Sequence, residues 1–591
     1  MTKFRLPLAA AAAIAGLLFS FPAVAQQAAD RLQPEAASGM RPAASEPAKA
    51  KTFMVAAANP VAARAGFDIL KKGGNAIDAM VATQLVLNLV EPQSSGIGGG
   101  AFLVYFDAKA GRLTTFDGRE TAPAGADPKL FLDEAGDPLE FYDAVVGGRS
   151  VGTPGTLRLL YDTHQRFGAL DWKTVVEPAI TLAKIGFEVS PRLHALIAAE
   201  GDRLKRYAAA REYFFDAKGE PLATGTLLKN EAFAETLQTI AEKGAAGFYE
   251  GPVAEALVAT VQNAEGNPGR LALSDLRNYR VVEREPVCAA YRVYEVCGMG
   301  PPSSGALTVG QILGLIEPFD IAGLGPGSAE AWRLIGDASR LAFADRGRYM
   351  ADIDYVPMPL KGLLDKDYLT GRSELLRGGR ALSDDAVAPG TPPFDHAMLR
   401  GDDDAIELPS TSHFVIVDGA GDVVSMTTTI ENGFGSRLMT GGFLLNNELT
   451  DFSFETHDEE GRVIANAVAP GKRPRSSMSP TVVMREGKPV LALGSPGGSQ
   501  IIGYVAEALI AVLDWDMNVQ QAAGLPHLLN RFGPFEVEAG TSATQLSGAL
   551  RDLGFTVKET DLNSGIQAIA ITPDGLSGGA DPRREGVALG E

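Results

Sequence analysis

The sequence predicts an α+β protein in which a mostly helical part precedes a strand-rich part. Between residues 150 and 350, apolar residues recur at helical spacing over several long stretches. From Thr411 onward, short runs of β-branched and aromatic residues alternate with glycine-rich turns, as is typical of strands. The chain has 591 residues, 45% hydrophobic and 21% charged, so its composition is that of a globular protein with a large core.

The N-terminus is organised like a secretory signal peptide. Lys3 and Arg5 precede the apolar run 6–21, and Ala23-Val24-Ala25 follows as a small-residue cleavage site. The apolar run is too short for a bilayer span, which needs about 20 residues. We therefore expect removal of residues 1–25, a periplasmic or secreted protein without a membrane anchor, and a disordered lead-in over residues 26–50.

Charge and cysteine content exclude several classes of partner. The net charge of −20 argues against nucleic acid or an anionic membrane, which need basic patches. The two cysteines, Cys288 and Cys297, flank a strand-like run. A disulfide between neighbouring strands and a pair of reduced thiols are both compatible with this spacing. Two cysteines with no nearby histidine do not form a zinc site, and nothing in the sequence indicates another metal or an organic cofactor.

The first part of the mature chain should contain two helices and two strands. Residues 60–70 and 76–90 have helical character, and the second helix is apolar on all sides, so we expect it to be buried. Gly96–Gly100 superficially resembles a dinucleotide loop, but a strand follows where that loop needs a helix. Arg119 lies just after the strand 112–116. It is either a solvated surface group or a carboxylate-binding arginine, and the residues alone leave both open.

The central part should be helical up to an irregular segment. Residues 380–410 lack periodicity and are rich in Asp, Gly and Pro, which predicts a long exposed loop. We expect its Asp402-Asp403-Asp404 to be a solvated charge run. The expected helices before it are Gly155–Phe167, Trp172–Ile185, Ser190–Tyr207, Ala232–Lys243, Val253–Gln262, Pro301–Glu317 and Ala329–Asp345.

Thr411 lies where this irregular segment gives way to the strand 412–417. A threonine that opens a strand is ordinarily structural. If the bond before Thr411 is cut, however, its free α-amine can accept the proton of its own Oγ, which makes it a nucleophile. His413 should lie on the same side of the strand, where we expect a packed, hydrogen-bonded side chain rather than a base.

A second strand, 423–429, should pair with the first through a glycine-containing turn. Farther on, Gly494–Ser499 connects the strand 489–493 to the helix 500–513. Such a loop presents backbone N–H groups at the positive end of a helix and can bind phosphate or stabilise an oxyanion. No Lys-Ser/Thr pair follows it, so it is not a nucleoside-triphosphate loop.

Taken together, these segments resemble the γ-glutamyltranspeptidase family over nearly the whole mature chain. The resemblance implies the N-terminal-nucleophile hydrolase fold, a four-layer αββα sandwich with a largely helical accessory part. It also implies a precursor that cuts itself between Ser410 and Thr411 into a large subunit, 51–410, and a small subunit, 411–591. The residues that carry the resemblance are Gly73–Ala79, Gly96–Gly100, Asp117–Pro123, Pro301–Gly305, Thr411–His413, Leu444–Asn447, Arg473–Pro480, Gly494–Ser499 and Gly579–Arg583.

The resemblance also implies a role for individual residues. Thr411 is the nucleophile, the Thr429 hydroxyl supports it, and Gly497 and Gly498 donate N–H groups to the oxyanion. The α-groups of a γ-glutamyl substrate need a clamp of opposite charges. By family match, Arg119, Ser476 and Ser477 hold the α-carboxylate, and Glu448 and Asp451 hold the α-ammonium.

Glu431 departs from the pattern of well-known members, which carry asparagine at this place. A third carboxylate favours an ammonium and disfavours an acyl group without one, unless Glu431 pairs with an arginine such as Arg437. The expected activity is transfer of the γ-glutamyl group of glutathione or a related compound to water, an amino acid or a peptide. Two alternatives are a β-lactam acylase that takes glutaryl groups and an uncut secreted binding protein.

Overall fold

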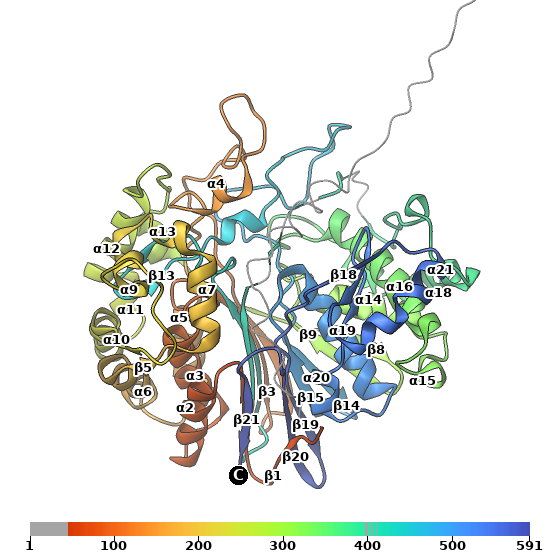
Figure 1. The fold of residues 1–591 in the computed structure, drawn as a ribbon, viewed down its shortest axis with the longest axis horizontal. Coiled ribbons are helices and arrows are strands. Elements are labelled where there is room, and N and C mark those ends of the chain that lie inside the picture. Colours follow the sequence, from red (N-terminus) through yellow and green to blue (C-terminus); the bar gives the residue numbers. More distant parts are fainter. Residues whose placement is uncertain (1–44, 396–399, 404, 406, 409) are drawn as a thin grey trace, which may run out of the picture.

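The computed structural model describes residues 45–395, 400–403, 405, 407–408 and 410–591. Two seven-stranded sheets lie face to face in the middle of the molecule, and helices cover the outer face of each (Figure 1). This four-layer arrangement confirms the predicted αββα sandwich. The predicted signal peptide and most of the lead-in lie outside the described residues.

The first sheet holds the strand that follows Thr411. That strand, β10 (Ser412–Val417), lies near the centre and pairs antiparallel with β2 and β11. The register pairs Ser412 with Thr428, so Thr411 and Thr429 occupy the next opposed positions. The strand order is β21 (Val587–Gly590), β2 (Met54–Ala57), β10, β11 (Val423–Thr429), β3 (Gly100–Asp107), β4 (Arg112–Gly118) and β7 (Val282–Arg284).

The second sheet leads into the glycine loop that precedes α19. Its β8 and β9 place Cys288 opposite Cys297, and the two sulfurs are bonded at 2.04 Å. The strand order is β1 (Ala48–Ala50), β20 (Gly575–Ala580), β19 (Gln567–Thr572), β15 (Lys488–Gly494), β14 (Thr481–Arg485), β9 (Tyr294–Gly298) and β8 (Val287–Tyr291).

Alternation along β10 explains how the layers pack. Val415 and Val417 point between the sheets, into an apolar layer that includes residues of both. Phe414 and Ile416 point the other way, toward the helical layer that contains α3. The main helices on this side are α2 (Pro60–Lys71), α3 (Ala76–Val90), α5 (Thr156–Phe167), α6 (Trp172–Ile185), α10 (Glu231–Lys243) and α12 (Gly251–Gln262); those on the second sheet are α14 (Gly305–Ile316), α16 (Ala329–Tyr349) and α19 (Ile501–Leu513).

Two helix predictions differ from the structure. The helix expected over 190–207 is divided into α7 (Pro191–Ala199) and α8 (Gly201–Leu204), with non-helical backbone at Glu200. Glu200 ends α7 there because its buried carboxylate bonds Arg203 and Arg437. The helix expected from Pro301 begins at Gly305. Pro302 has no backbone N–H to donate, and it restricts the backbone conformation of Pro301 before it.

The prediction of an exposed loop before Thr411 is wrong for the described residues nearest to Thr411. Glu407, Leu408 and Ser410 are buried. The expected solvated charge run is also wrong at Asp403, whose side chain is fully buried 2.8 Å from the guanidinium of Arg475. These acidic groups enter the interior because buried arginines compensate their charge.

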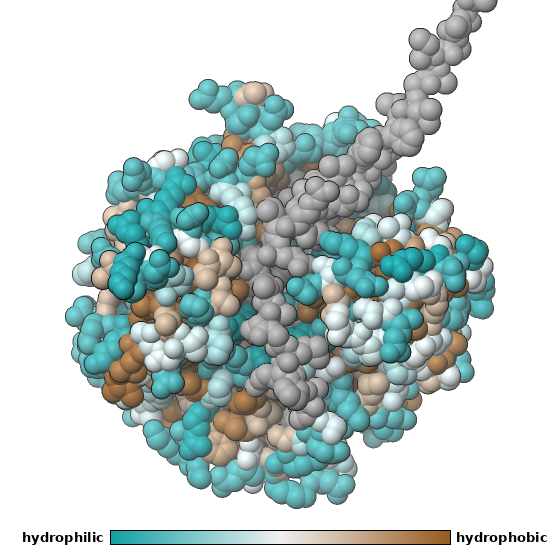
Figure 2. Space-filling view, in the orientation of Figure 1, coloured by the Kyte–Doolittle hydropathy of each residue, from teal (hydrophilic) through white to brown (hydrophobic). Residues whose placement is uncertain are grey.

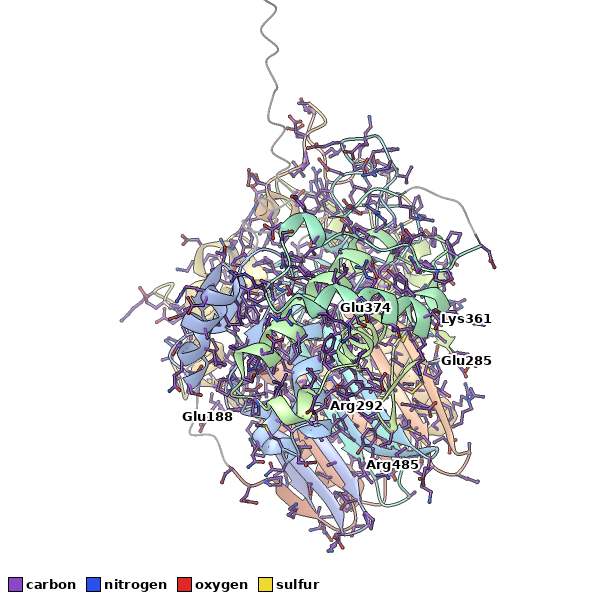
Figure 3. All side chains as sticks on the ribbon, turned by 90° about the vertical axis from the view of Figure 1, so that its right-hand side faces the viewer. Glu188, Glu285, Arg292, Lys361, Glu374 and Arg485 are labelled. Carbon is purple, nitrogen blue, oxygen red and sulfur yellow. A yellow bond between two sulfur atoms is a disulfide. The ribbon has the colours of Figure 1, made fainter. Side chains whose placement is uncertain are left out.

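The face in Figure 2 is mostly hydrophilic, with small scattered hydrophobic patches. Charged side chains labelled in Figure 3, such as Lys361 and Glu374, lie at the exposed periphery. Within the described residues, none of the helices combines the length and hydropathy that a bilayer span requires.

Candidate active site

Thr411 stands at the entrance of β10 in a constrained backbone conformation. Its φ is 130°, a value that a β-branched residue adopts only when its surroundings impose it. The side chain is buried, and its Oγ1 donates to Thr429 Oγ1 at 3.4 Å. Thr429 Oγ1 also accepts from the backbone N–H of Glu431 at 2.8 Å. The Thr411 carbonyl accepts from Arg584 Nη1 at 3.1 Å, so the residue is held from both sides.

The glycine loop after β15 faces the same place. Gly497 and Gly498 have φ of 138° and 56°, which side-chain-bearing residues rarely adopt. Gly498 begins the short helical turn η4 (Gly498–Gln500), which continues into α19. The backbone of Glu407 and Leu408 lies directly against Gly498, and a Cβ added there would come within 2.6 Å of the Leu408 carbonyl. The loop therefore has no room for a side chain at Gly498.

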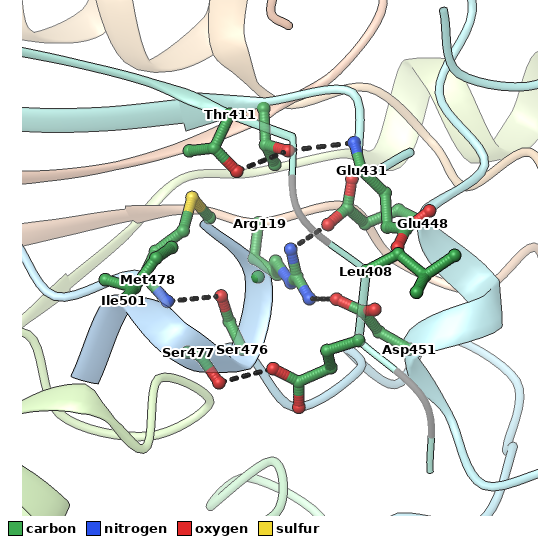
Figure 4. A pocket seen from close by; sticks show the side chains of 13 residues that line it. Arg119, Leu408, Thr411, Glu431, Glu448, Asp451, Ser476, Ser477, Met478 and Ile501 are labelled. Carbon is green, nitrogen blue, oxygen red and sulfur yellow. Dashed lines mark hydrogen bonds and ion pairs between the residues drawn. The ribbon is translucent and has the colours of Figure 1, made fainter. Parts of the chain in front are cut away.

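Arg119 is buried rather than solvated, and it is already paired. Its guanidinium bonds Glu448 and lies 2.5 Å from Asp451 Oδ2 (Figure 4). Its Nε donates to the Pro474 carbonyl at 3.2 Å. Burial raises the pKa of both carboxyls, more strongly for Asp451, while the charge of Arg119 opposes that rise. The predicted carboxylate-binding and ammonium-binding groups are thus in direct contact.

Glu431 adds another buried acid to this cluster. Its carboxylate accepts from the side-chain amide of Asn447, and its φ is 73°. Burial and the nearby charge of Glu448 raise the pKa of Glu431 to about 8. Arg437, which the sequence offered as a partner for Glu431, instead pairs with Glu200 at 2.8 Å. Glu431 therefore faces the pocket without a direct ion pair to Arg437.

The adjacent serines complete one wall. Ser476 Oγ accepts from the backbone N–H of Met478 at 3.1 Å. Ser477 Oγ donates to the Glu407 carboxylate and accepts from Arg346 Nη2 at 2.7 Å. The sequence singled out the serine pair but neither Glu407 nor Arg346. A lone glutamate in an aperiodic loop and an arginine within a long helix carry no recognisable pattern.

One small cavity joins most of these residues. Its volume is about 20 Å³, room for about one water molecule. Gly497 is not among the lining residues, although the adjacent Gly498 is. The lining residues are Arg119, Glu407, Leu408, Thr411, Thr429, Glu431, Glu448, Asp451, Ser476, Ser477, Met478, Gly498 and Ile501.

Comparison with known proteins identifies the family to which this chain belongs. A model of the γ-glutamyltranspeptidase family matches residues 62–591. This chain is a member of that family. The glutathione hydrolase proenzyme of Bacillus subtilis strain 168 is 37% identical over 553 residues, which cover 91% of this chain and 92% of that protein. The glutathione hydrolase proenzyme of Escherichia coli K12 is 36% identical over 586 residues, which cover 98% and 97%.

A solved structure agrees with the N-terminal-nucleophile hydrolase fold. The cephalosporin acylase from Bacillus halodurans superimposes with a TM-score of 0.81 at 27% identity, over 93% of this chain and 98% of its own. The cephalosporin acylase and the glutathione hydrolases are both consistent with the N-terminal-nucleophile hydrolase fold predicted from the sequence.

Two buried histidines do not line this pocket. His413 is buried, its Nδ1 is 2.9 Å from Thr427 Oγ1, and burial lowers its pKa to about 3, so it is neutral. His527 lies in a separate buried network with Glu507 and Ser564. In the part of the chain that the structure describes, no group of His, Cys, Asp or Glu side chains could hold a metal ion.

Proposed function

We propose that this protein is a self-processing γ-glutamyl hydrolase and transpeptidase with Thr411 as nucleophile. The observation that carries the proposal is the shared pocket: the threonine pair, Gly498, one arginine and several acids line a single cavity. The relatives named glutathione hydrolase proenzyme support both the activity and the precursor. Glutathione is the proposed donor, and an amino acid or peptide is the proposed acceptor besides water.

Processing would begin with attack of Thr411 Oγ on the Ser410 carbonyl carbon. The new C–O bond replaces the peptide C–N bond, and the departing nitrogen takes the hydroxyl proton, so that an ester links the two chains. Water then hydrolyses the ester and leaves Ser410 with a carboxylate and Thr411 with a free α-amine. The forced φ of Thr411 supports this step, because cutting the bond releases the constraint.

Turnover would use the α-amine that processing creates. Its reference pKa is about 7.7–8.0, so at neutral pH it can exchange a proton with Oγ. Oγ attacks the γ-amide carbon, and the N–H groups of Gly497 and Gly498 stabilise the oxyanion. The proton passes to the leaving amine, and a γ-glutamyl ester remains on Thr411. Water or an acceptor amine then attacks the ester and regenerates the hydroxyl.

The clamp would select the γ-glutamyl group by its two charges. Glu431, Glu448 and Asp451 supply acceptors for the α-ammonium, while Arg119, Ser476 and Ser477 face the α-carboxylate. A glutaryl group has a carboxylate but no ammonium, so it would form no charge-assisted hydrogen bond with these acids. The pocket therefore favours γ-glutamyl amides over the glutaryl amides of a β-lactam acylase.

The test combines mass spectrometry with hydrolysis assays on two p-nitroanilide substrates. Intact mass of the purified protein should show two chains, the smaller beginning at Thr411, and export should have removed residues 1–25. γ-Glutamyl-p-nitroanilide should be hydrolysed, and glutaryl-p-nitroanilide should react far more slowly. A stable uncut chain with no turnover would support the binding-protein alternative, and preference for the glutaryl compound would support the acylase.

A further inference from the structure

Glu407 and Leu408 fill the candidate pocket in the uncut chain. The Glu407 carboxylate accepts a hydrogen bond from Ser477, a residue of the proposed α-carboxylate clamp. Leu408 lines the same pocket as Glu431, a residue of the proposed ammonium site, and its backbone lowers the pKa of Glu431. Glu407 thus presents a carboxylate to one end of the proposed clamp, and Leu408 lies beside the other end.

The same two residues cover the proposed oxyanion loop. A Cβ at Gly498 would lie 2.6 Å from the Leu408 carbonyl and 2.8 Å from the Glu407 carbonyl oxygen. The remaining cavity holds about one water. A γ-glutamyl compound therefore needs the space that Glu407 and Leu408 occupy, and cutting after Ser410 frees the end of their segment.

Two buried arginines surround the Glu407 carboxylate. Arg346, from α16, pairs with it directly and donates to Ser477 Oγ at 2.7 Å. Arg475 Nε lies 3.4 Å from the same carboxylate, and its Nη1 lies 2.8 Å from Asp403. The two arginine side chains are only 5% and 1% exposed. The acids that compensate them, Asp403 and Glu407, both belong to the segment ahead of the cut.

Departure of that segment would leave two buried guanidinium groups without these carboxylates. An uncompensated buried charge is strongly destabilising, so an incoming anion binds such a site well. Burial opposes ionisation of Glu407, yet the charges of Arg346 and Arg475 lower its pKa to about 2. The place beside Ser477 therefore strongly favours a carboxylate.

Arg119 already pairs with carboxylates of the protein, so it does not replace a separate carboxylate site. Its guanidinium is occupied by Glu448 and Asp451, and its Nη2 also donates to the carbonyl of Arg475 at 2.7 Å. A carboxylate that binds Arg119 alone would compete with two acids of the protein. The acids that pair directly with Arg346 and Arg475, namely Asp403 and Glu407, would instead have moved away.

We propose that Arg346 and Arg475, with Ser477, form a carboxylate subsite that Glu407 fills before the cut and the α-carboxylate of the γ-glutamyl donor fills afterward. This inference rests on the proposed function and adds two specificity residues to it. Before the cut, Glu407 and Leu408 therefore occupy the place that the substrate takes afterward. The subsite recognises compounds that carry a carboxylate on the acyl group, whatever their leaving amine.

The test compares two donors in the cut enzyme. γ-Glutamyl-p-nitroanilide has the α-carboxylate, whereas 4-aminobutyryl-p-nitroanilide keeps the amine and lacks it. Arg475→Met should lower kcat/KM for the γ-glutamyl compound about 10- to 100-fold, as expected for a lost charge-assisted hydrogen bond. The ratio of the two kcat/KM values should fall by a similar factor. Arg346→Lys should lower the ratio less, because it keeps the charge but loses the forked geometry.

Rates are divided by the concentration of cut chain, so that slow processing is not mistaken for weak binding. Arg333→Met is the matched control: Arg333 is also buried on α16 but pairs with Glu330 at 2.7 Å. Its donor ratio should equal that of the parent. An unchanged ratio in both Arg475→Met and Arg346→Lys would overturn the subsite. A parent enzyme that ignores the γ-glutamyl compound would instead refute the proposed function, and the subsite with it.

Discussion

The hydroxyl oxygens of Thr411 and Thr429 lie 3.4 Å apart while the peptide bond between Ser410 and Thr411 is still intact. The pairing of β10 with β11 fixes this distance, because the two threonines follow the last paired positions of the two strands. The proposed nucleophile is therefore positioned before the proposed cut rather than by it.

Replacing the nucleophile should abolish processing. We expect Thr411→Ala to remain a single chain on denaturing gels, because no oxygen is available to attack Ser410. Thr411→Ser should still be cut, but more slowly, since the hydroxyl remains without the methyl group that limits its rotamers. Intact mass after timed incubation measures both. Cutting of the alanine variant at the same bond would contradict the nucleophile assignment.

Removing the second hydroxyl should weaken catalysis without preventing folding. Thr429→Ala deletes the acceptor of the Thr411 hydroxyl and of the Glu431 N–H. We expect about a 10- to 100-fold fall in kcat, since each lost hydrogen bond is worth about 1–2 kcal/mol. Steady-state kinetics on the cut enzyme provides the measurement. Thr429→Ser, which keeps the oxygen, is the control and should retain most of the activity.

Arg584 should act as a positioning residue for Thr411. Its Nη1 holds the Thr411 carbonyl at 3.1 Å, and its Nε donates to the Ser564 carbonyl. We expect Arg584→Met to slow both processing and kcat while KM changes little, because the residue orients the nucleophile rather than the substrate. Arg584→Lys should recover part of the rate. A rise in KM alone would show that Arg584 serves substrate binding instead.

The stability of the uncut protein should fall as the pH rises. The pKa of Glu431 is raised from 4.5 to about 8 by burial and by Glu448. The folded state thus binds this proton more tightly than the unfolded state does. The stabilisation is complete below the ordinary pKa and is lost as the pH rises from 4.5 through 8, by a few kcal/mol at most.

This pH dependence can be measured by urea denaturation of Thr411→Ala, in which the chain stays intact and Glu407 stays in place. The free energy of unfolding should be higher near about pH 5.5 than near about pH 8. Adding Glu431→Gln should flatten the slope, because the amide does not titrate. The remaining slope belongs to other buried groups. Glu120, Glu448, Asp451 and Glu507, whose pKa values burial raises, act in the same direction as Glu431. His413 and His527, whose pKa values burial lowers, act in the opposite direction. An equal slope in both proteins would show that Glu431 does not titrate in this range.

Much of this architecture could be predicted because it depends on local patterns. The density of β-branched and aromatic residues over 412–417 identified β10, and the uniformly apolar 76–90 identified a buried α3. The glycine loop was recognisable because it lies between a strand and a helix. The pairing of Arg119 with Glu448 and Asp451 could not be predicted. The resemblance assigned Arg119 to the α-carboxylate of a substrate and the two acids to its α-ammonium, at the opposite end.

The residues missed by sequence reasoning make contacts across long chain distances. Arg346 comes from a helix and Glu407 from an aperiodic segment, and only tertiary packing brings them to Ser477, which the sequence did indicate. Asp403 was misjudged for the same reason: three consecutive acids indicate solvent exposure unless a buried arginine is known to lie nearby. Local periodicity carries no information about such partners.

The strand order gives a cut between Ser410 and Thr411 a mechanical consequence. In the first sheet, β10 of the downstream chain lies between β2 of the upstream chain and β11, while β11 pairs on its other side with upstream β3. In the second sheet, upstream strands lie at both edges. Each sheet contains strands of both chains, so the chains cannot separate without breaking the backbone hydrogen bonds between strands in both sheets. Dilution should therefore never yield a free folded subunit. The cut enzyme should melt in one cooperative transition in which the chains unfold and separate together, so its midpoint should rise with protein concentration.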